Sequence, residues 1–316
     1  MKILITGGAG CLGSNLIEKW LPQGYEICVL DNFATGKREV VPDFSGLEVH
    51  EGHIADIEFV DKCFDSFRPD VVVHSAASYK DPNNWKEDTR TNVEGAISVA
   101  RACLKFDVEK VINFQTSLCF GRPENLPIPA DHPERPFTSY GISKTAGEMY
   151  LLQSGLNVIS LRLANITGPR LAIGPIPTFY ERLRAGKSCF CSDTKRDFLD
   201  MEDFLTLMDL LIEKNLPSGK FNISTGKSHS ILEIFNLVAK YLQVEIQKEP
   251  DVIPAGHDDV AEVVLDPSKT FDLLGWEANI GFEETINRML SWYDQHGVSA
   301  IYSHLKSPTE KNDKGE

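Results

Sequence analysis

Three glycines near the N-terminus constrain the fold of this chain more than any other feature. Gly7, Gly10 and Gly13 recur every third residue, between an apolar segment at residues 3–6 and a helical pattern at residues 12–21. In a strand–loop–helix unit, glycine permits the tight turn, lets the backbone approach a pyrophosphate, and lets the helix pack closely on the strand. The N–H groups that open such a helix bind anions. The segment therefore predicts a dinucleotide-binding loop.

Short apolar segments alternate with helical patterns through the first half of the chain. Val71 to Val73 and the pair Val158-Ile159 are apolar without alternation, which is typical of strands that are covered on both faces. Strand–helix alternation of this kind predicts an α/β fold with a doubly wound parallel sheet (Rossmann). Strands are predicted at residues 3–6, 26–30, 71–74, 111–114 and 158–163, and helices at residues 12–21, 92–106 and 140–153.

A smaller mixed α/β lobe is predicted after residue 168, where prolines interrupt the pattern. Ser230 and Glu233 have the spacing of a capping box and predict a helix that ends near Leu242. The chain is divided into a dinucleotide-binding domain at 1–168, a substrate lobe at 169–305 whose strands can interleave with the first sheet, and a disordered polar tail at 306–316. Further helices are predicted at residues 179–185, 204–214 and 282–295, with strands near residue 190 and at 260–265.

Charge and composition exclude several classes of partner. The net charge of −14, without a Lys/Arg cluster, argues against nucleic acid. The sequence begins directly with a predicted strand, and no apolar run reaches the ~18 residues that span a bilayer. Seven scattered cysteines indicate reduced thiols, and no His or second Cys pair completes a zinc set around Cys189 and Cys191. We therefore expect a cytoplasmic protein without a metal site or a membrane partner.

Asp31 ends the second predicted strand, 18 residues after Gly13. A carboxylate there accepts hydrogen bonds from the ribose diol and repels a 2′-phosphate, which favours NAD over NADP. Lys37 is a basic neighbour that makes the preference less than absolute. The alternative is a turn-forming Asp31-Asn32 pair beside a loop that binds nothing.

Tyr140 and Lys144 are four residues apart and share one face of a predicted helix. A phenol with a pKa near ~10 is a poor base at neutral pH, but an adjacent ammonium and a positively charged cofactor lower that pKa. Such pairs are common on helices by chance. The order of glycine loop, Asp31, Asn92, a Ser/Thr strand end and then this pair predicts hydride chemistry, with Tyr140 as the base.

The glycine spacing and the Tyr-Gly-Ile-Ser-Lys run from Tyr140 resemble the short-chain dehydrogenase/reductase superfamily. From Lys2 to about Tyr293 the chain resembles the extended branch, which contains nucleotide-sugar epimerases and dehydratases, and within it an epimerase/dehydratase-like group of lipopolysaccharide O-antigen gene clusters. The resemblance implies NAD as cofactor, a UDP-sugar substrate, and a homodimer in which the helices at residues 92–106 and after Tyr140 form a four-helix bundle.

The resemblance assigns the substrate hydroxyl bond to Thr116, five residues before Gly121, with Ser117 as the alternative. Sugar 4,6-dehydratases of the family carry Asp-Glu directly after the threonine. This chain has Ser117-Leu118, and leucine cannot transfer a proton, so 4,6-dehydration is disfavoured. The expected catalytic residues are Thr116, Tyr140 and Lys144.

Further cofactor contacts are implied by the resemblance. Ile54 falls where the family touches adenine, although His53 replaces the usual Asp, and Asn92 falls where the family steadies the active-site helix. For His53 and His74, a packing or hydrogen-bonding role is favoured over a general base. The expected cofactor-binding residues are Gly7, Gly10, Cys11, Leu12, Gly13, Asp31, Asn32, Phe33, Gly36, Ile54, His74, Ala76, Ala77, Asn92, Tyr140, Lys144 and Leu163.

On the substrate side, Arg196 falls in the family's Arg-Asp-Phe/Tyr motif and is expected to bind the pyrophosphate through its planar fork. The alternative is a structural ion pair with Asp197 or Asp200. Gly256 replaces a second family arginine, whose contact is either missing or supplied by Arg182 or Arg184. The expected substrate-binding residues are Lys80, Thr116, Asn165, Pro175, Ile176, Phe179, Arg196 and Asp259.

The function predicted from these residues is C4 epimerisation of a UDP-hexose, N-acetylhexosamine or uronic acid through a 4-keto intermediate, in surface polysaccharide precursor synthesis. Alternatives are a dehydratase that uses other acids, a 4-keto reductase, or a catalytically silent NAD-sensing protein. The intact Tyr140–Lys144 pair argues against the last of these.

Overall fold

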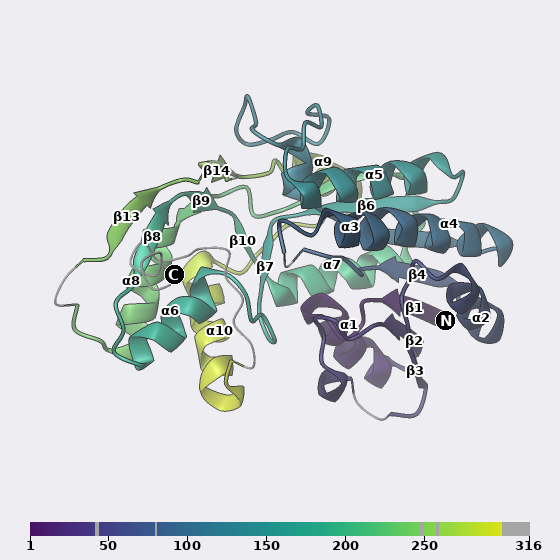
Figure 1. Cartoon of the computed structure of the whole chain (residues 1–316), viewed down its shortest axis with the longest axis horizontal. Coiled ribbons are helices and arrows are strands. Elements are labelled where there is room, and N and C mark those ends of the chain that lie inside the picture. Colours follow the sequence, from purple (N-terminus) through teal and green to yellow (C-terminus); the bar gives the residue numbers. More distant parts are fainter. Residues whose placement is uncertain (42–43, 80, 247–248, 257–258, 299–316) are drawn as a thin grey trace, which may run out of the picture.

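A computed structural model describes residues 1–298, except residues 42–43, 80, 247–248 and 257–258 (Figure 1). The tail predicted at 306–316 and the predicted substrate residue Lys80 therefore lie outside the described residues. Within the described part of the chain, every helix is too short or too polar to cross a membrane.

A seven-stranded parallel sheet organises the larger part of the molecule. Its strand order is β11-β6-β5-β4-β1-β2-β3, and neighbouring strands are parallel throughout. The predicted doubly wound α/β fold is confirmed. The strands are β1 (Lys2–Thr6), β2 (Glu26–Asp31), β3 (Leu47–Glu51), β4 (Val71–His74), β5 (Lys110–Thr116), β6 (Val158–Leu163) and β11 (Gly219–Ile223).

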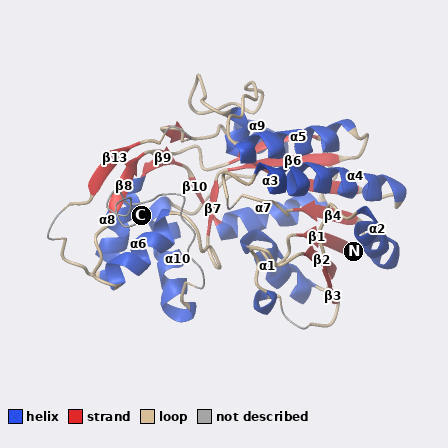
Figure 2. Ribbon diagram, in the orientation of Figure 1, coloured by secondary structure: helices blue, strands red, loops and turns tan. Residues whose placement is uncertain are grey.

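Helices cover both faces of this sheet, because successive side chains on each strand point to opposite faces. On β1, Ile3 and Ile5 pack in one hydrophobic cluster with α1 (Cys11–Trp20) and α7 (Met201–Glu213). Leu4, between them, packs in the other cluster with α2 (Ile57–Phe67), α4 (Gly95–Lys105) and α5 (Ser139–Gln153). Figure 2 shows these helices in blue around the red strands.

The helix predicted at residues 92–106 begins earlier in the structure. The short α3 (Trp85–Asp88) runs into a π-helical segment (Thr89–Glu94), which continues as α4. Widened turns of this kind are rare and are frequent at functional sites. Three 3-10 turns lie at Leu21–Gln23, Arg38–Val40 and Ser117–Phe120.

The second lobe is built around its own hydrophobic cluster. Phe179, Phe235 and Met289, from α6 (Pro175–Arg184), α8 (Ile231–Leu242) and α10 (Phe282–His296), meet there. The predicted capping box of Ser230 and Glu233 is confirmed at the start of α8. The remaining elements are β7 (Asn165–Thr167), β8 (Phe190–Asp193), β9 (Lys195–Arg196), β10 (Phe198–Asp200), β12 (His229–Ser230), β13 (Asp251–Pro254) and β14 (Glu262–Val263), whereas α9 (Ser268–Leu274) packs against the large sheet.

The chain passes between the two parts more than once. After β10 it returns to the large sheet, where α7 packs in the first cluster and β11 pairs with β6. It then enters the second lobe again at β12. Residues 201–223 thus belong by packing to the large sheet, although they follow residue 168.

Candidate active site

The predicted cofactor residues gather at the carboxyl edge of the large sheet. Asp31, His74, Thr116 and Leu163 are the last residues of β2, β4, β5 and β6. In register, Thr6 of β1 lies beside His74, and Thr116 lies beside Leu163. Strand order reverses between β4 and β1, which is where open α/β sheets bind ligands.

The glycine loop has no room for side chains at two of its three predicted positions. Gly7 has a φ of 69°, and a Cβ there would lie 2.8 Å from the backbone of Ala76. A Cβ on Gly13 would lie 2.6 Å from the Cα of Gly8, so the absence of a side chain lets α1 pack closely on the loop that follows β1. A Cβ on Gly10 would meet a carbonyl oxygen at 3.2 Å, a looser contact that leaves space for a phosphate.

The first turn of α1 offers uncapped amides to an anion. Gly10 provides no side-chain cap and the first turn carries no acid, so the N–H groups and the positive end of the helix dipole are available. Cys11 and Asn15 donate to the carbonyl of Pro169, at 3.4 and 3.0 Å. Burial raises the pKa of the Cys11 thiol to about 12, which keeps it neutral beside the loop. This turn fits the pyrophosphate of a dinucleotide.

The carboxylate of Asp31, at the end of β2, is hydrogen-bonded to the glycine loop. Its two carboxylate oxygens accept from the amides of Ala9 and Phe33, both at 2.8 Å. Burial raises the pKa of Asp31, and these amide bonds act in the opposite direction. A carboxylate has about four acceptor sites, so both oxygens can still accept from a ribose diol. A Cβ on Gly36 would lie 2.7 Å from Ala9, which brings the segment after Asp31 against the loop.

The two histidines near the cofactor edge make hydrogen bonds that need no proton transfer. Nδ1 of His74 lies 2.9 Å from Oγ1 of Thr6, and burial together with the charge of Lys144 lowers the pKa of His74 to about 3. His74 is therefore a neutral imidazole. Nε2 of His53 lies 3.1 Å from a carboxylate oxygen of Glu87, while Ile54 packs over Gly95.

Asn92 joins the segment after β4 to the helix that carries Tyr140. Its Oδ1 accepts from the amide of Ser78 at 2.9 Å, and its Nδ2 donates to the Ser78 carbonyl and to Oγ of Ser143. Asn92 is 2% exposed. The position matches the steadying role that the resemblance implies.

Gln115 connects two of the three predicted catalytic residues, Thr116 and Lys144. Its Oε1 accepts from the amide of Thr116 at 2.7 Å, and its Nε2 donates to the carbonyl of Lys144 at 3.1 Å. Thr116 ends β5 and its Oγ1 accepts from the amide of Leu118. The sequence does not indicate this connecting role of Gln115, because its partner on α5 is 29 residues away.

Burial dominates the electrostatics of the predicted pair. It raises the pKa of Tyr140, and Tyr79 and Asp88 raise it further. In the protein without cofactor, the pKa of Tyr140 is therefore raised and not lowered, contrary to the prediction for Lys144. Burial also lowers the pKa of Lys144 to about 8, against the charge of Glu148, which acts to raise it. A positively charged cofactor would favour the phenolate at this position.

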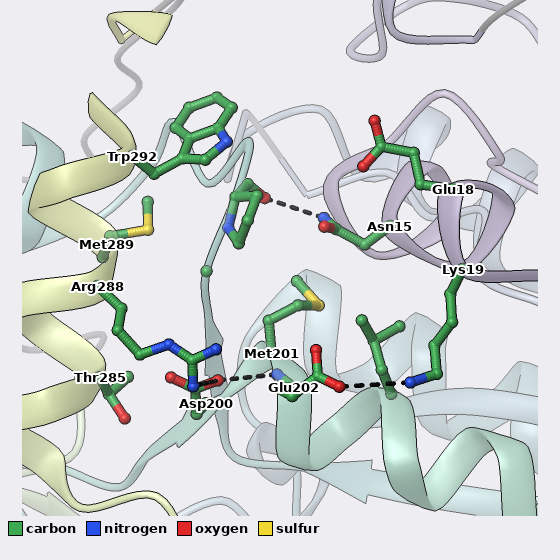
Figure 3. A pocket seen from close by; sticks show the side chains of 13 residues that line it. Asn15, Glu18, Lys19, Asp200, Met201, Glu202, Thr285, Arg288, Met289 and Trp292 are labelled. Atoms are coloured by element: carbon green, nitrogen blue, oxygen red, sulfur yellow. Dashed lines mark hydrogen bonds and ion pairs between the residues drawn. The ribbon is translucent and has the colours of Figure 1, made fainter. Parts of the chain in front are cut away.

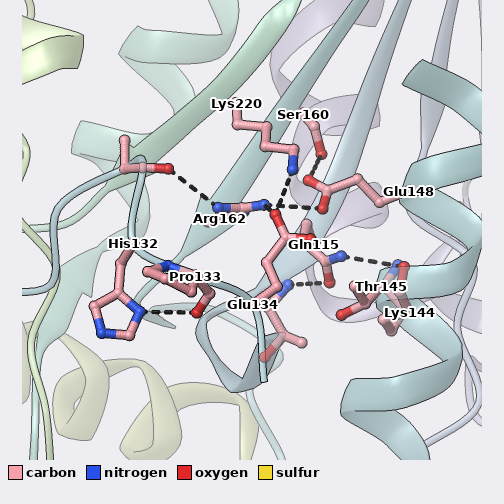
Figure 4. Close-up of polar contacts among 12 residues, drawn as sticks. Gln115, His132, Pro133, Glu134, Lys144, Thr145, Glu148, Ser160, Arg162 and Lys220 are labelled. Carbon is pink, nitrogen blue, oxygen red and sulfur yellow. Dashed lines mark hydrogen bonds and ion pairs between the residues drawn. The ribbon is translucent and has the colours of Figure 1, made fainter. Parts of the chain in front are cut away.

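A buried ion network stands behind the catalytic helix (Figure 4). Glu148 of α5 accepts from Arg162 at 3.1 Å and from Ser160 at 2.6 Å. Arg162 is fully buried, and it also pairs with Glu134, which in turn pairs with Lys220. The network fixes α5 to β6, β11 and the segment before α5, so the position of Lys144 depends on residues from four parts of the fold.

Arg196 pairs with Asp259 on the substrate side. The guanidinium contacts the Asp259 carboxylate, and burial lowers the pKa of Arg196 against that charge. The alternative pair with Asp197 or Asp200 does not form. Asp197 accepts from Thr225 and the next amide, and Asp200 caps α7 and lies 3.4 Å from a guanidinium of α10.

The other predicted substrate residues differ in their surroundings. Nδ2 of Asn165 donates to the carbonyl of Asp197 at 3.0 Å. Ile176 and Phe179 are 1% and 3% exposed and lie in the core of the second lobe, so these two side chains pack inside it. Pro175, at the first turn of α6, is half-buried.

The two arginines considered as substitutes at position 256 have protein partners. Arg184 bonds to Tyr180 and lies 3.1 Å from Asp294, at the surface of the second lobe. Nε of Arg182 donates to the carbonyl of Ser188.

A cavity of about 390 Å³ lies between α1, α7 and α10 (Figure 3). Lys19 and Arg288 bring cations to it, paired with Glu202 and Asp200 at 3.4 Å. None of the predicted catalytic residues lines it. The cavity adjoins Asn15 of α1 and Pro169, and it does not include Tyr140.

The sequence profile of the NAD dependent epimerase/dehydratase family matches residues 3–224. The chain belongs to this family. The predicted family resemblance, the fold and the NAD cofactor are thereby confirmed.

Several known proteins are similar over nearly their whole length. The Bordetella bronchiseptica enzyme WbmG, solved in complex with NAD and UDP, is 60% identical, with a TM-score of 0.92 over 97% of this chain and 99% of that one. WbmH of the same organism, solved with NAD⁺, is 38% identical, with a TM-score of 0.89 over 94% and 99%. The UDP-glucose 4-epimerase of Lacticaseibacillus casei is 28% identical over 94% of this chain and 98% of the relative.

Proposed function

We propose that this protein is an NAD-dependent UDP-sugar 4-epimerase. One observation carries the proposal: Thr116 at the end of β5 is joined through Gln115 to the helix of Tyr140 and Lys144, with Ser117-Leu118 where a 4,6-dehydratase carries the Asp-Glu acid and base. Leucine cannot transfer a proton. Relatives named UDP-glucose 4-epimerase and a neighbour solved with NAD and UDP support the substrate class.

Tyr140 is the base that takes the proton of the sugar C4 hydroxyl and later returns it. Lys144 is buried one helical turn further along α5, where an ammonium stabilises a phenolate. The hydroxyl of Thr116 orients the same sugar hydroxyl. The glycine loop and Asp31 would hold NAD, which would supply reversible hydride acceptance from C4 of the sugar and return of the hydride to the opposite face. Arg196 holds the pyrophosphate while the sugar turns.

The second lobe is proposed as the nucleotide-sugar part, with Arg196 and Asp259 as binding residues. The proposed division at residue 168 includes an interleaved segment, because residues 201–223 pack with the large sheet. The prediction that the sugar serves surface polysaccharide synthesis, and the cytoplasmic location, also remain proposals. All seven cysteines are free, which suits a reducing compartment.

We further propose a homodimer through α4 and α5. Ile142, Met149 and Tyr150 on α5 are 52%, 55% and 54% exposed, and Leu104 on α4 is 50% exposed. A surface that exposes several large apolar side chains on adjacent helices is suited to association. Two copies joined here would form the four-helix bundle that the resemblance implies.

The test is interconversion of C4 epimers by purified protein without added cofactor, followed by NMR over a panel of UDP-sugars. With substrate deuterated at C4, the label should stay on C4. Release of the label to solvent would contradict the mechanism. Solvent deuterium at C5 or C6 would indicate elimination, and stoichiometric consumption of NADH would indicate a reductase. Tyr140→Phe is the inactive control.

A further inference from the structure

A buried carboxylate beside Tyr140 has no place in the chemistry described so far. Asp88, the last residue of α3, is 2% exposed. Its Oδ1 accepts from Oγ of Ser78 at 2.9 Å, and its Oδ2 accepts from Oγ of Ser139 at 2.6 Å. In the described part of the chain, no Lys, Arg or His lies within ion-pair distance of it. Buried carboxylates without a cationic partner are rare, because burying the charge is costly.

The two serines place this carboxylate at the start of the catalytic helix. Ser139 directly precedes Tyr140 and is the first residue of α5. Ser78 lies after β4 and is bonded to Asn92, which also bonds Ser143 one turn into α5. Asp88 and Asn92 thus hold the same two segments from α3 and from the π-helical segment that follows it.

We propose that Asp88 is a positioning residue for Tyr140, which fixes the first turn of α5 through Ser139 and sets a buried negative charge beside the phenol. The proposal rests on the proposed function, in which Tyr140 moves the substrate proton. The charge of Asp88 raises the pKa of Tyr140, in addition to burial and Tyr79. Tyr79 approaches edge-on, with ring centroids 6.3 Å apart.

The consequence is a phenol that keeps its proton until positive charge is added to the site. In the described chain, Tyr79 from the segment after β4 and Asp88 from α3 raise the pKa of Tyr140. Lys144 lies one turn along the same helix, where its charge acts on His74. A carboxylate opposes the phenolate, whereas an ammonium and an oxidised nicotinamide favour it. Asp88 therefore makes deprotonation of Tyr140 depend more strongly on the oxidised cofactor.

The experiment separates the charge of Asp88 from its contacts. Asp88→Asn keeps the size of the side chain and one acceptor oxygen, offers an NH₂ group that can donate to the second serine oxygen, and removes the charge. Ser139→Ala keeps the charge and removes one contact. The phenolate of Tyr140 is titrated by its near-ultraviolet absorbance in the NAD-loaded protein, as the difference from the same background carrying Tyr140→Phe. This readout needs no substrate, so it remains informative if epimerase activity is absent.

We expect Asp88→Asn to lower the titration midpoint of Tyr140 by about one pH unit, and to move the acid limb of kcat in the same direction. Ser139→Ala should leave the midpoint in place and lower kcat several-fold, with KM little changed. An unchanged midpoint in Asp88→Asn, or an equal shift in both variants, would overturn the proposal. Asp88→Ser is a second neutral variant if Asp88→Asn does not fold.

Discussion

Arg196 on β9 is paired with Asp259, which follows it by 63 residues, and the two side chains are 17% and 34% exposed. The carboxylate holds the guanidinium in one place without removing all of its donors, because an arginine has five N–H groups. An arginine held in this way is preorganised for a pyrophosphate.

Removal of the Arg196 fork should weaken substrate binding and spare the cofactor. We expect Arg196→Ala to raise KM for the UDP-sugar by about 10- to 100-fold, the loss of a charge-assisted hydrogen bond, with kcat reduced less. Lys195→Ala is the matched control, since Lys195 is the exposed neighbour on the same strand. Steady-state kinetics measure KM and kcat, and the NAD content of each preparation shows whether cofactor binding is unchanged. Equal effects of the two variants would argue against a role for Arg196 in binding.

Substitution at Gly13 should remove the cofactor. A Cβ at Gly13 would lie 2.6 Å from Gly8 Cα and 2.7 Å from the Gly7 carbonyl oxygen, and these backbone atoms cannot yield as a side chain can. Gly13→Ala should therefore displace α1 and lower NAD affinity at least tenfold. In Gly219→Ala, the added methyl would meet Phe221 at an ordinary 3.7 Å, so this control should bind NAD normally. Bound NAD is measured after denaturation, and equal NAD content in both variants would contradict the argument.

Lys144 should make the protein less stable at neutral pH than its apolar analogue. Its pKa is lowered from 10.5 to about 8 in the folded protein. Below about pH 8 both states carry the charge and the folded state bears the cost of burying it. Between about 8 and 10.5 the unfolded state binds more protons, so stability rises with pH.

Lys144→Met should then be inactive but more stable by about 3 kcal/mol at pH 7. The difference should shrink as the pH approaches 10.5. Urea unfolding of the protein without NAD at several pH values measures this. Lys240→Met, in which the lysine is 74% exposed, should show no such trend. If the difference in unfolding free energy between Lys144→Met and the parent protein does not change with pH, packing and not charge is its cause.

Local patterns in the sequence predicted the strands that carry the cofactor residues. The predicted strands at 71–74 and 158–163 match β4 and β6 in full. β3 and α2 were missed: β3 reads Leu-Glu-Val-His-Glu and is only partly buried at the sheet edge, so its apolar signal is weak. β11 contains Gly219 and Lys220, and its place beside β6 depends on pairing with residues 60 positions earlier.

At the candidate active site, the sequence indicated which residues are present better than it indicated their hydrogen-bond and ion-pair partners. The sequence offers the neighbours Asp197 and Asp200 as ion-pair partners of Arg196, whereas the observed partner, Asp259, lies 63 residues further along the chain. Gln115 and Asp88 gave no signal for the same reason, because their partners belong to other elements. Gly8 could have been found from the double glycine at 7–8, since its Cβ would lie 2.7 Å from the methyls of Val29.

Loss of Arg162 should destabilise the fold severely. It is fully buried and pairs with Glu148 and Glu134. Arg162→Ala leaves the buried Glu148 without its cation and leaves Glu134 with Lys220 alone, so it should cost about 3–5 kcal/mol in urea unfolding at neutral pH. Although burial acts to raise it, the bonds from Lys220 and Arg162 lower the pKa of Glu134. The stability that Glu134 contributes is therefore present above the pKa of its unfolded state and is lost as the pH falls through the pKa of its folded state. Arg162→Ala should accordingly lose less stability than the parent protein when the pH is lowered.

The control for Arg162 is an ion pair at the surface. Arg135 and Glu124 are 64% and 67% exposed, and Arg135→Ala should change stability by less than about 1 kcal/mol. A comparable loss in both variants would contradict the importance of burial in the network.

The apolar face on α4 and α5 gives the last prediction. If two copies pair there, Ile142→Glu with Met149→Glu places four carboxylates in one apolar interface and should weaken association by well over tenfold, about 1.4 kcal/mol or more. Sedimentation velocity at micromolar concentration should show a dimer for the parent and a monomer for the double variant. Leu273→Glu on α9 alters a side chain that is 50% exposed elsewhere on the surface and should remain dimeric. Because Tyr140 and Lys144 lie on α5 as well, the monomer should also lose activity, and a parent that sediments as a monomer would rule out this interface.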